Sequence, residues 1–235
     1  MSVGTRLDEL ASRYELPPAA ASALGHLIAL ICADPAAPTA LRDPATAVDA
    51  HVADALVALE LAPVREARRI ADLGSGAGFP GLVLAAALPS AEVALVEANR
   101  RKCDYLERAA GEMELVNTVV VPSRAESWQQ GAGSRDLVTA RAVAPLSVLV
   151  EYAAPLLAPG GALVAWKGRR DGGEEADGIA AAQATGLELA EIRPVQPWNG
   201  AENLHLHLYL KVGLTPNRFP RRPGIASKRP LRAST

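Results

Sequence analysis

From Arg69 onward, short apolar segments alternate with helix-like segments, and this alternation restricts the fold more than any other feature of the chain. The predicted strands are Arg69–Leu73, Glu92–Glu97, Thr118–Val121, Asp136–Ala140 and Ala162–Trp166, and the predicted helices between them are Gly81–Leu88, Arg100–Met113 and Pro145–Leu157. Strands and helices that alternate in this way form right-handed βαβ units around a parallel sheet. We therefore expect an α/β domain with helices on both faces of the sheet.

The predicted domain spans residues 63–212, and its last two strands follow a different pattern. Leu187–Pro194 and Asn203–Val212 have no convincing helix between them, so they predict an antiparallel hairpin at one edge of the sheet.

Helices are predicted before this domain, in a cap over residues 1–62. Ala19–Ile31 is rich in Ala and Leu, and Thr46–Leu61 places apolar residues close to helical spacing. After the domain, residues 213–235 contain four prolines among basic residues and show no periodicity. They predict an extended or disordered tail that orders on a partner.

The formal net charge of −2 hides an uneven distribution. Lys211–Thr235 holds seven basic residues and no acidic one, which leaves 17 basic and 26 acidic residues, a charge of −9, in the first 210. An acidic body with a basic tail indicates a polyanionic partner, most simply nucleic acid. The alternative is a tail that only improves solubility.

Other features limit the classes of protein. The longest apolar runs fall short of the roughly 18–20 residues of a membrane span, and the N-terminus has no secretory signal pattern. Cys32 and Cys103 are far apart and lack metal-ligand spacing, so we expect neither a disulfide scaffold nor a metal site. These features predict a cytoplasmic protein.

The strongest local signal is the glycine-rich segment Asp72–Gly81, which follows one predicted strand and opens a predicted helix. Gly74, Gly76 and Gly78 permit tight turns and the close approach of a ligand. The spacing of Gly76, Gly78 and Gly81 also satisfies G-x-G-x-x-G, a fingerprint of dinucleotide binding that is weak by itself.

Charge distinguishes the two classes of ligand. Asp72 ends the strand directly before the glycines, where a carboxylate disfavours a pyrophosphate and suits a cationic group. Glu97 ends the next strand and can accept hydrogen bonds from ribose hydroxyls in either class. S-adenosylmethionine carries an ammonium and a sulfonium and no phosphate, so this pair favours it over NAD. An NAD-dependent oxidoreductase remains the alternative.

Six segments follow one another in a recognisable order: the glycine loop, Leu95–Lys102, Ser123–Glu126, Thr139–Leu146, Trp166–Gly168 and the basic Thr215–Gly224. Together they resemble the glucose-inhibited division protein B family, the methyltransferases of bacterial small-subunit ribosomal RNA. His51–Leu56 is similar to the family's H-x-x-D-S-L segment, with Ala55 in place of the usual Ser. The match covers about residues 45–230 in one consistent order.

The resemblance implies a class I S-adenosylmethionine-dependent methyltransferase fold, Rossmann-like, with a seven-stranded mostly parallel sheet and an N-terminal helical extension. It implies methyl transfer to N7 of one guanine in 16S rRNA. The expected cofactor-binding residues are Asp72, Gly74, Gly76, Gly78, Phe79, Glu97, Ala125, Glu126 and Arg141, with Ala125 and Glu126 on the adenine side. The expected partner is 16S rRNA or the small ribosomal subunit, and the expected state is a monomer.

Arg141 and Lys167 are the predicted catalytic residues, because each follows an apolar strand where ligands of open α/β sheets bind. Arg141 can donate to guanine O6, a phosphate or the carboxylate of the methyl donor. The structural alternatives are a salt bridge from Arg141 to an acid such as Glu126 and a surface role for Lys167. Guanine N7 carries no proton, so this chemistry requires no general base.

Basic residues outside the site are the predicted RNA contacts: Arg100, Arg101, Lys102, Arg169, Arg218, Arg221 and Arg222. Trp128, Trp166 and Trp198 are candidates for base stacking, although Trp166 lies in an apolar strand. His51 and Asp54 share one face of a predicted helix, where a structural role is the simplest interpretation. A small-molecule methyltransferase and a non-catalytic RNA-binding module are the remaining alternatives.

Overall fold

The structure is a computed structural model that describes residues 2–233. Within these residues one sheet has seven strands in the order β3-β2-β1-β4-β5-β7-β6. The strands are β1 (Arg69–Leu73), β2 (Glu92–Val96), β3 (Thr118–Val121), β4 (Arg135–Arg141), β5 (Leu157–Lys167), β6 (Leu187–Val195) and β7 (Leu204–Lys211). Strands β1 to β5 pair in parallel, and β7 is antiparallel to both β5 and β6. The predicted parallel sheet and the edge hairpin are both confirmed.

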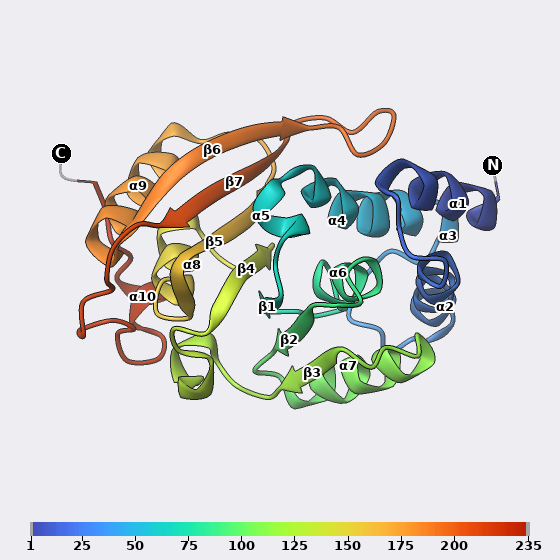
Figure 1. Ribbon diagram of the computed structural model, residues 1–235, viewed down its shortest axis with the longest axis horizontal. Helices are drawn as coiled ribbons and strands as arrows, with labels where there is room; N and C mark the ends of the chain where they lie inside the picture. Colours follow the sequence, from blue (N-terminus) through green and yellow to red (C-terminus); the bar gives the residue numbers. More distant parts are fainter. Residues whose placement is uncertain (1, 234–235) are drawn as a thin grey trace.

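Two layers of helices cover the sheet (Figure 1). Their bounds are α1 (Val3–Tyr14), α2 (Ala20–Ala33), α3 (Pro44–Ala47), α4 (Asp54–Leu56), α5 (Ala62–Arg65), α6 (Gly81–Ala87), α7 (Arg100–Glu112), α8 (Leu146–Ala153), α9 (Gly172–Thr185) and α10 (Ile225–Lys228). The N-terminal helices pack with α6 and α7 in one apolar core, and α8 and α9 build a second core on the opposite face. The apolar strands of the middle are therefore buried on both sides, as parallel sheets require.

The helical cap is confirmed, but Thr46–Leu61 is not one regular helix. A π-helical segment, η1 (Val48–Ala53), and a 3-10 segment, η2 (Val57–Glu60), interrupt it. Every residue from Val52 to Leu59 is buried, so packing on α6 determines this backbone more than helical periodicity does. The π-helical turn lies next to the carboxyl edge of the sheet.

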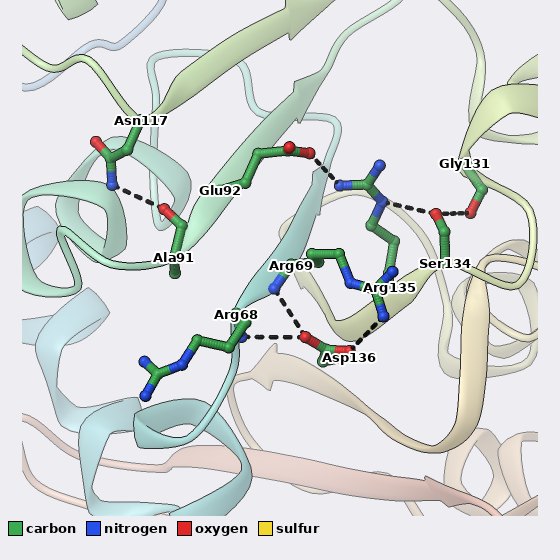
Figure 2. Close-up of polar contacts among 9 residues, drawn as sticks. All are labelled: Arg68, Arg69, Ala91, Glu92, Asn117, Gly131, Ser134, Arg135 and Asp136. Carbon is green, nitrogen blue, oxygen red and sulfur yellow. Dashed lines mark hydrogen bonds and ion pairs between the residues drawn. The ribbon is translucent and has the colours of Figure 1, made fainter.

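The amino and carboxyl ends of the strands form two opposite edges of the sheet, and different contacts are found at each. Figure 2 shows the amino edge, where the Asp136 carboxylate accepts from the backbone N–H groups of Arg68 and Arg69 at 3.1 and 2.9 Å. Beside it, Arg135 donates to Glu92 at 2.7 Å and to the Ser134 hydroxyl at 3.1 Å. These contacts join strand starts to one another and satisfy their polar groups. In open α/β sheets, ligands bind outside the carboxyl ends of the strands.

Of the two predicted forms of the tail, extended or disordered, the disordered form is wrong for the part of residues 213–235 that the structure describes. The tail folds back on α8 and contains α10 (Figure 1, red). Phe219 and Ala226 are buried, and the Arg221 guanidinium makes two hydrogen bonds to Glu151, whose side chain is 1% exposed. A few apolar side chains and one buried ion pair thus order a segment that lacks periodicity.

Candidate functional site

The loop after β1 turns through three glycines with positive φ: Gly74 (66°), Gly76 (56°) and Gly78 (95°). A Cβ at Gly78 would lie 2.3 Å from Leu82 Cδ1, and one at Gly74 would lie 2.8 Å from a methyl of Val143. The Gly74 N–H donates to Val96 O at 2.8 Å, which holds the loop against the end of β2. The loop thus has the tight, side-chain-free backbone that the sequence predicts.

Asp72 does not face a ligand, contrary to the prediction. The residue is 0% exposed, and its carboxylate accepts from the Thr139 hydroxyl at 2.9 Å and from the Gly81 N–H at 3.2 Å. Burial raises its pKa to about 6. Its place beneath the loop makes Asp72 the residue that joins β1, β4 and the start of α6, and it shapes the loop from below.

Glu97, and not Asp72, places its carboxylate against the glycine loop. Its Oε2 accepts from the Gly76 N–H at 3.2 Å and its Oε1 from the Asn99 N–H at 2.8 Å. A carboxylate therefore lies directly against the glycine loop, where it repels a pyrophosphate. Each oxygen keeps a lone pair for a ribose hydroxyl.

Ala125 and Glu126 lie in the 3-10 segment η3 (Ala125–Ser127), after β3. The Glu126 carboxylate accepts from the Gly224 N–H of the tail at 3.0 Å. The tail is thus tied to the segment predicted to hold the adenine, a connection that no sequence pattern indicated.

Arg141, at the end of β4, connects the sheet to the cap. It donates to Asp54 Oδ2 at 2.7 Å, to Ala50 O at 3.1 Å and to His51 Nδ1 at 3.2 Å. Its guanidinium lies 5.2 Å from the centroid of the Phe79 ring, on which His51 stacks at 4.4 Å. The salt bridge that the sequence left open is therefore with Asp54 and not with Glu126.

His51 is neutral in this cluster. Burial and the neighbouring Arg141 lower its pKa to about 4. Since Nδ1 accepts from Arg141, Nε2 carries the proton and donates to the Thr39 hydroxyl at 3.1 Å. The pair that shares one helix face in the sequence thus meets the predicted catalytic arginine; the signal for it was the three-residue spacing of His51 and Asp54.

A pocket of about 330 Å³ opens beside this cluster at the ends of β4 and β5, within the size range of small-ligand sites. Its lining includes Asp54, Arg141, Trp166, Lys167 and His205. The structure therefore brings both predicted catalytic residues to one cavity.

Lys167 is held at this pocket by two contacts. Its Nζ lies 2.5 Å from Glu174 Oε1 and donates to Ala144 O at 3.2 Å. Ala142, which directly follows Arg141 and also lines the pocket, has a positive φ of 57°. This uncommon backbone for a residue with a Cβ turns the chain at the pocket wall.

The predicted RNA contacts divide into exposed and paired side chains. The exposed ones are Arg100, Arg101, Arg169, Arg218 and Arg222, and Lys102 is half-buried. Arg100 pairs with Asp104 at 3.2 Å. Arg221 is not available in the same way, because its guanidinium is committed to the buried Glu151.

The three tryptophans differ in exposure. Trp166 is buried, as its strand predicts, and donates from Nε1 to Asp54 O at 2.8 Å. Trp128 is buried under Arg135, and Trp198 is half-buried against the cap core.

Among residues 2–233 there is no cluster of three or more potential metal ligands. No helix in the same range has both the length and the apolar stretch needed to cross a membrane.

The chain is similar to one protein family over most of its length. The family model described as rRNA small subunit methyltransferase G (GidB) matches residues 37–199. The Ribosomal RNA small subunit methyltransferase G of Rubrobacter xylanophilus is 41% identical over 197 residues, which cover 81% of this chain and 76% of that protein. The protein of the same name from Chloroflexus aggregans is 42% identical over 200 residues, 82% of each chain.

Solved structures share the architecture. A SAM-dependent methyltransferase from Aquifex aeolicus matches with a TM-score of 0.58 at 16% identity, over 72% of this chain and 94% of that one. A SAM-dependent O-methyltransferase from Thermotoga maritima matches with a TM-score of 0.53 at 19% identity, over 69% and 66%. At these identities the likeness shows the fold, which is the class I methyltransferase fold that the sequence predicts.

Proposed function

This chain belongs to the rRNA small subunit methyltransferase G family, and we propose that its carboxyl-edge site transfers the methyl group of S-adenosylmethionine to N7 of one guanine in 16S rRNA. The observation that carries this proposal is the position of Arg141. It lies within reach of both the glycine-loop residue Phe79 and the pocket at the ends of β4 and β5. One residue thus borders the place for the donor and the place for the acceptor base.

The residues around the glycine loop fit S-adenosylmethionine. Gly74, Gly76 and Gly78 leave the backbone bare, and Glu97 adds a carboxylate at the loop. In this role Glu97 binds the ribose hydroxyls, Ala125 and Glu126 border the adenine, and Phe79 packs against the donor. Asp72 holds the loop from below and makes no direct contact with the donor.

Little chemistry remains for side chains at the reacting atoms. S-adenosylmethionine supplies an activated methyl, so the N7 lone pair forms the new N–C bond as the S–C bond breaks, and no proton leaves N7. The protein supplies alignment and electrostatic control. Arg141 orients the base, and Lys167, held by Glu174, sits where negative charge on the RNA backbone approaches.

The exposed basic side chains are the proposed RNA surface. Arg100, Arg101 and Lys102 begin α7, Arg169 follows β5, and Arg218 and Arg222 lie on the tail. Phosphate contacts of this kind supply affinity without reading sequence. We further propose that the protein acts in the cytoplasm and as a monomer; sedimentation of the purified chain tests the oligomeric state.

Transfer of labelled methyl groups tests the proposed function. The purified chain, labelled S-adenosylmethionine and small subunits lacking this methylation should yield label in 16S rRNA, in a nucleoside identified as 7-methylguanosine. Label that appears only in small metabolites would support a small-molecule methyltransferase instead. Donor binding without transfer to any RNA would indicate a non-catalytic module, and tighter binding of NAD would indicate an oxidoreductase.

A further inference from the structure

The cap contributes an acidic side chain to the pocket of the proposed acceptor base. Asp54 begins α4, directly after the π-helical turn η1, and is 8% exposed. Its backbone carbonyl is fixed by Trp166 Nε1 at 2.8 Å, and its Oδ2 is fixed by Arg141 at 2.7 Å. Both Asp54 and Arg141 line the pocket. A buried carboxylate and a part-buried guanidinium therefore lie side by side at the pocket wall.

Both side chains keep unused hydrogen-bonding capacity. Arg141 gives one Nη2–H to His51 and its Nη1 hydrogens to Asp54 and Ala50. Within residues 2–233, no partner takes its Nε–H, and none donates to Asp54 Oδ1. Both residues line the pocket, so a ligand there can accept a hydrogen bond from Arg141 and donate one to Asp54.

Guanine presents this pattern on its Watson–Crick edge, where the O6 acceptor adjoins the N1–H donor. Adenine presents the reverse, with an amino donor at position 6 and an acceptor at N1. A donor from Arg141 beside an acceptor from Asp54 therefore matches guanine twice and mismatches adenine twice. Enzymes that modify a base commonly read it in this way after it leaves the stack.

We propose that Asp54 accepts a hydrogen bond from N1–H of the target base while Arg141 donates to O6, so that Asp54 selects guanine over adenine. This inference rests on the proposed function, because it assigns the base-reading contacts of the same site. It gives the helical cap a direct part in specificity, whereas a purely structural Asp54 would only orient Arg141.

The test compares Asp54→Asn with the unchanged protein on small subunits that carry guanine or adenine at the target position. Asn keeps the shape but replaces an acceptor with an amide that can donate. We expect the rate of methyl transfer to guanine to fall about 10- to 100-fold, while the rate of transfer to adenine does not fall. The ratio of the guanine rate to the adenine rate therefore falls by at least the same factor. Calorimetry should show unchanged affinity for S-adenosylmethionine.

Asp49→Asn is the matched control. Asp49 lies in η1, five residues before Asp54, but pairs with Arg6 at 2.9 Å on the outside of the cap, so its substitution should leave the ratio unchanged. An equal fall of both rates in Asp54→Asn would overturn the proposal, because Asp54 would then act only through Arg141. A fall in donor affinity that accounts for the whole effect would also overturn it.

A second arm uses the unchanged protein and so does not depend on the folding of a variant. Inosine keeps O6 and N1–H and lacks only the 2-amino group, so at the target position it should be methylated at a rate close to that of guanine. Rejection of inosine as strongly as adenine would overturn the proposal. Failure to methylate the guanine itself would overturn the proposed function and this inference together; the other outcomes leave the proposed function intact.

Discussion

At the scale of single residues, the carboxylates near the glycine loop have different surroundings and hence different roles. Asp72 is enclosed and bonded only to the protein, whereas Glu97 touches the loop and keeps free lone pairs. We therefore propose that Glu97, and not Asp72, favours a cationic donor over a pyrophosphate at the loop. The residue directly before the glycines maintains the shape of the loop.

The buried state of Asp72 predicts a pH effect on stability. Its pKa rises from 3.8 to about 6 on folding, so the native state binds more protons than the unfolded chain between pH 4 and 6. The contribution of the protonated Asp72 carboxyl to the free energy of unfolding is full below about pH 4 and is lost as pH rises through about 6. Asp72→Asn should therefore gain about 2 kcal/mol in free energy of unfolding relative to the unchanged protein across that range, measured by urea titration.

Asp104→Asn is the control substitution, because Asp104 lies exposed on α7, away from the glycine loop. A constant difference for Asp72→Asn would mean that Asp72 is ionised normally and that its burial is misjudged.

Glu97 gives a prediction about the donor. Glu97→Gln keeps an acceptor for the Gly76 N–H but removes the charge that we propose receives two ribose hydroxyls, so the dissociation constant for S-adenosylmethionine should rise about 10- to 100-fold. Glu92→Gln, at the opposite end of β2, should leave it unchanged. Calorimetry decides this, and equal affinities for both variants would remove Glu97 from the donor site.

At the scale of elements, the tail acts as a strap over α8 and η3. Arg221 neutralises Glu151, which is almost completely buried, and Gly224 binds Glu126. Removing one partner of a buried pair leaves an uncompensated charge. The tail therefore contributes to stability as well as carrying exposed basic residues.

Arg221→Ala should lower the free energy of unfolding by about 3 kcal/mol, because it strands the Glu151 carboxylate. Arg222→Ala, the exposed neighbour, should change it by less than about 0.5 kcal/mol. Chemical denaturation near neutral pH measures both. Similar small effects for the two variants would show that the tail does not depend on this pair.

The sequence predicts the elements best where one force dominates. Strand β1, which is largely buried, and the edge strand β3 both have the predicted bounds, because short apolar runs between turn residues leave little choice. The predicted helix Pro145–Leu157 ends early, at Ala153, since β5 begins at Leu157. The order of the tail could not be predicted, because it comes from single long-range contacts, which leave no periodic pattern in the sequence.

The site follows the same rule. Glycines after a strand and basic residues at strand ends are local signals, and they placed the loop, Arg141 and Lys167 correctly at the carboxyl edge. The burial of Asp72 and the bond from Arg141 to Asp54 depend on how the cap packs over the sheet. Contacts across such distances in sequence cannot be read from spacing within one segment.

At the scale of the whole molecule, the acidic body and the basic tail predict salt-dependent RNA binding. The double change Arg218→Ala and Arg222→Ala removes exposed tail charges without touching Arg221, so RNA affinity should fall and the salt slope should decrease by about 1 to 2. Arg13→Ala, on α1 at the far end of the molecule, is the control (Figure 1). Filter binding over a range of salt gives the slopes, and an unchanged slope would make the tail only a structural strap.

The most direct measurement is a map of modified nucleotides in 16S rRNA from cells with and without this protein. We expect one guanine to lose its N7 methyl group when the protein is absent and to regain it when the protein is restored. Identical maps from the two kinds of cell, or a lost modification at a different atom, would contradict the assignment of the carboxyl-edge site.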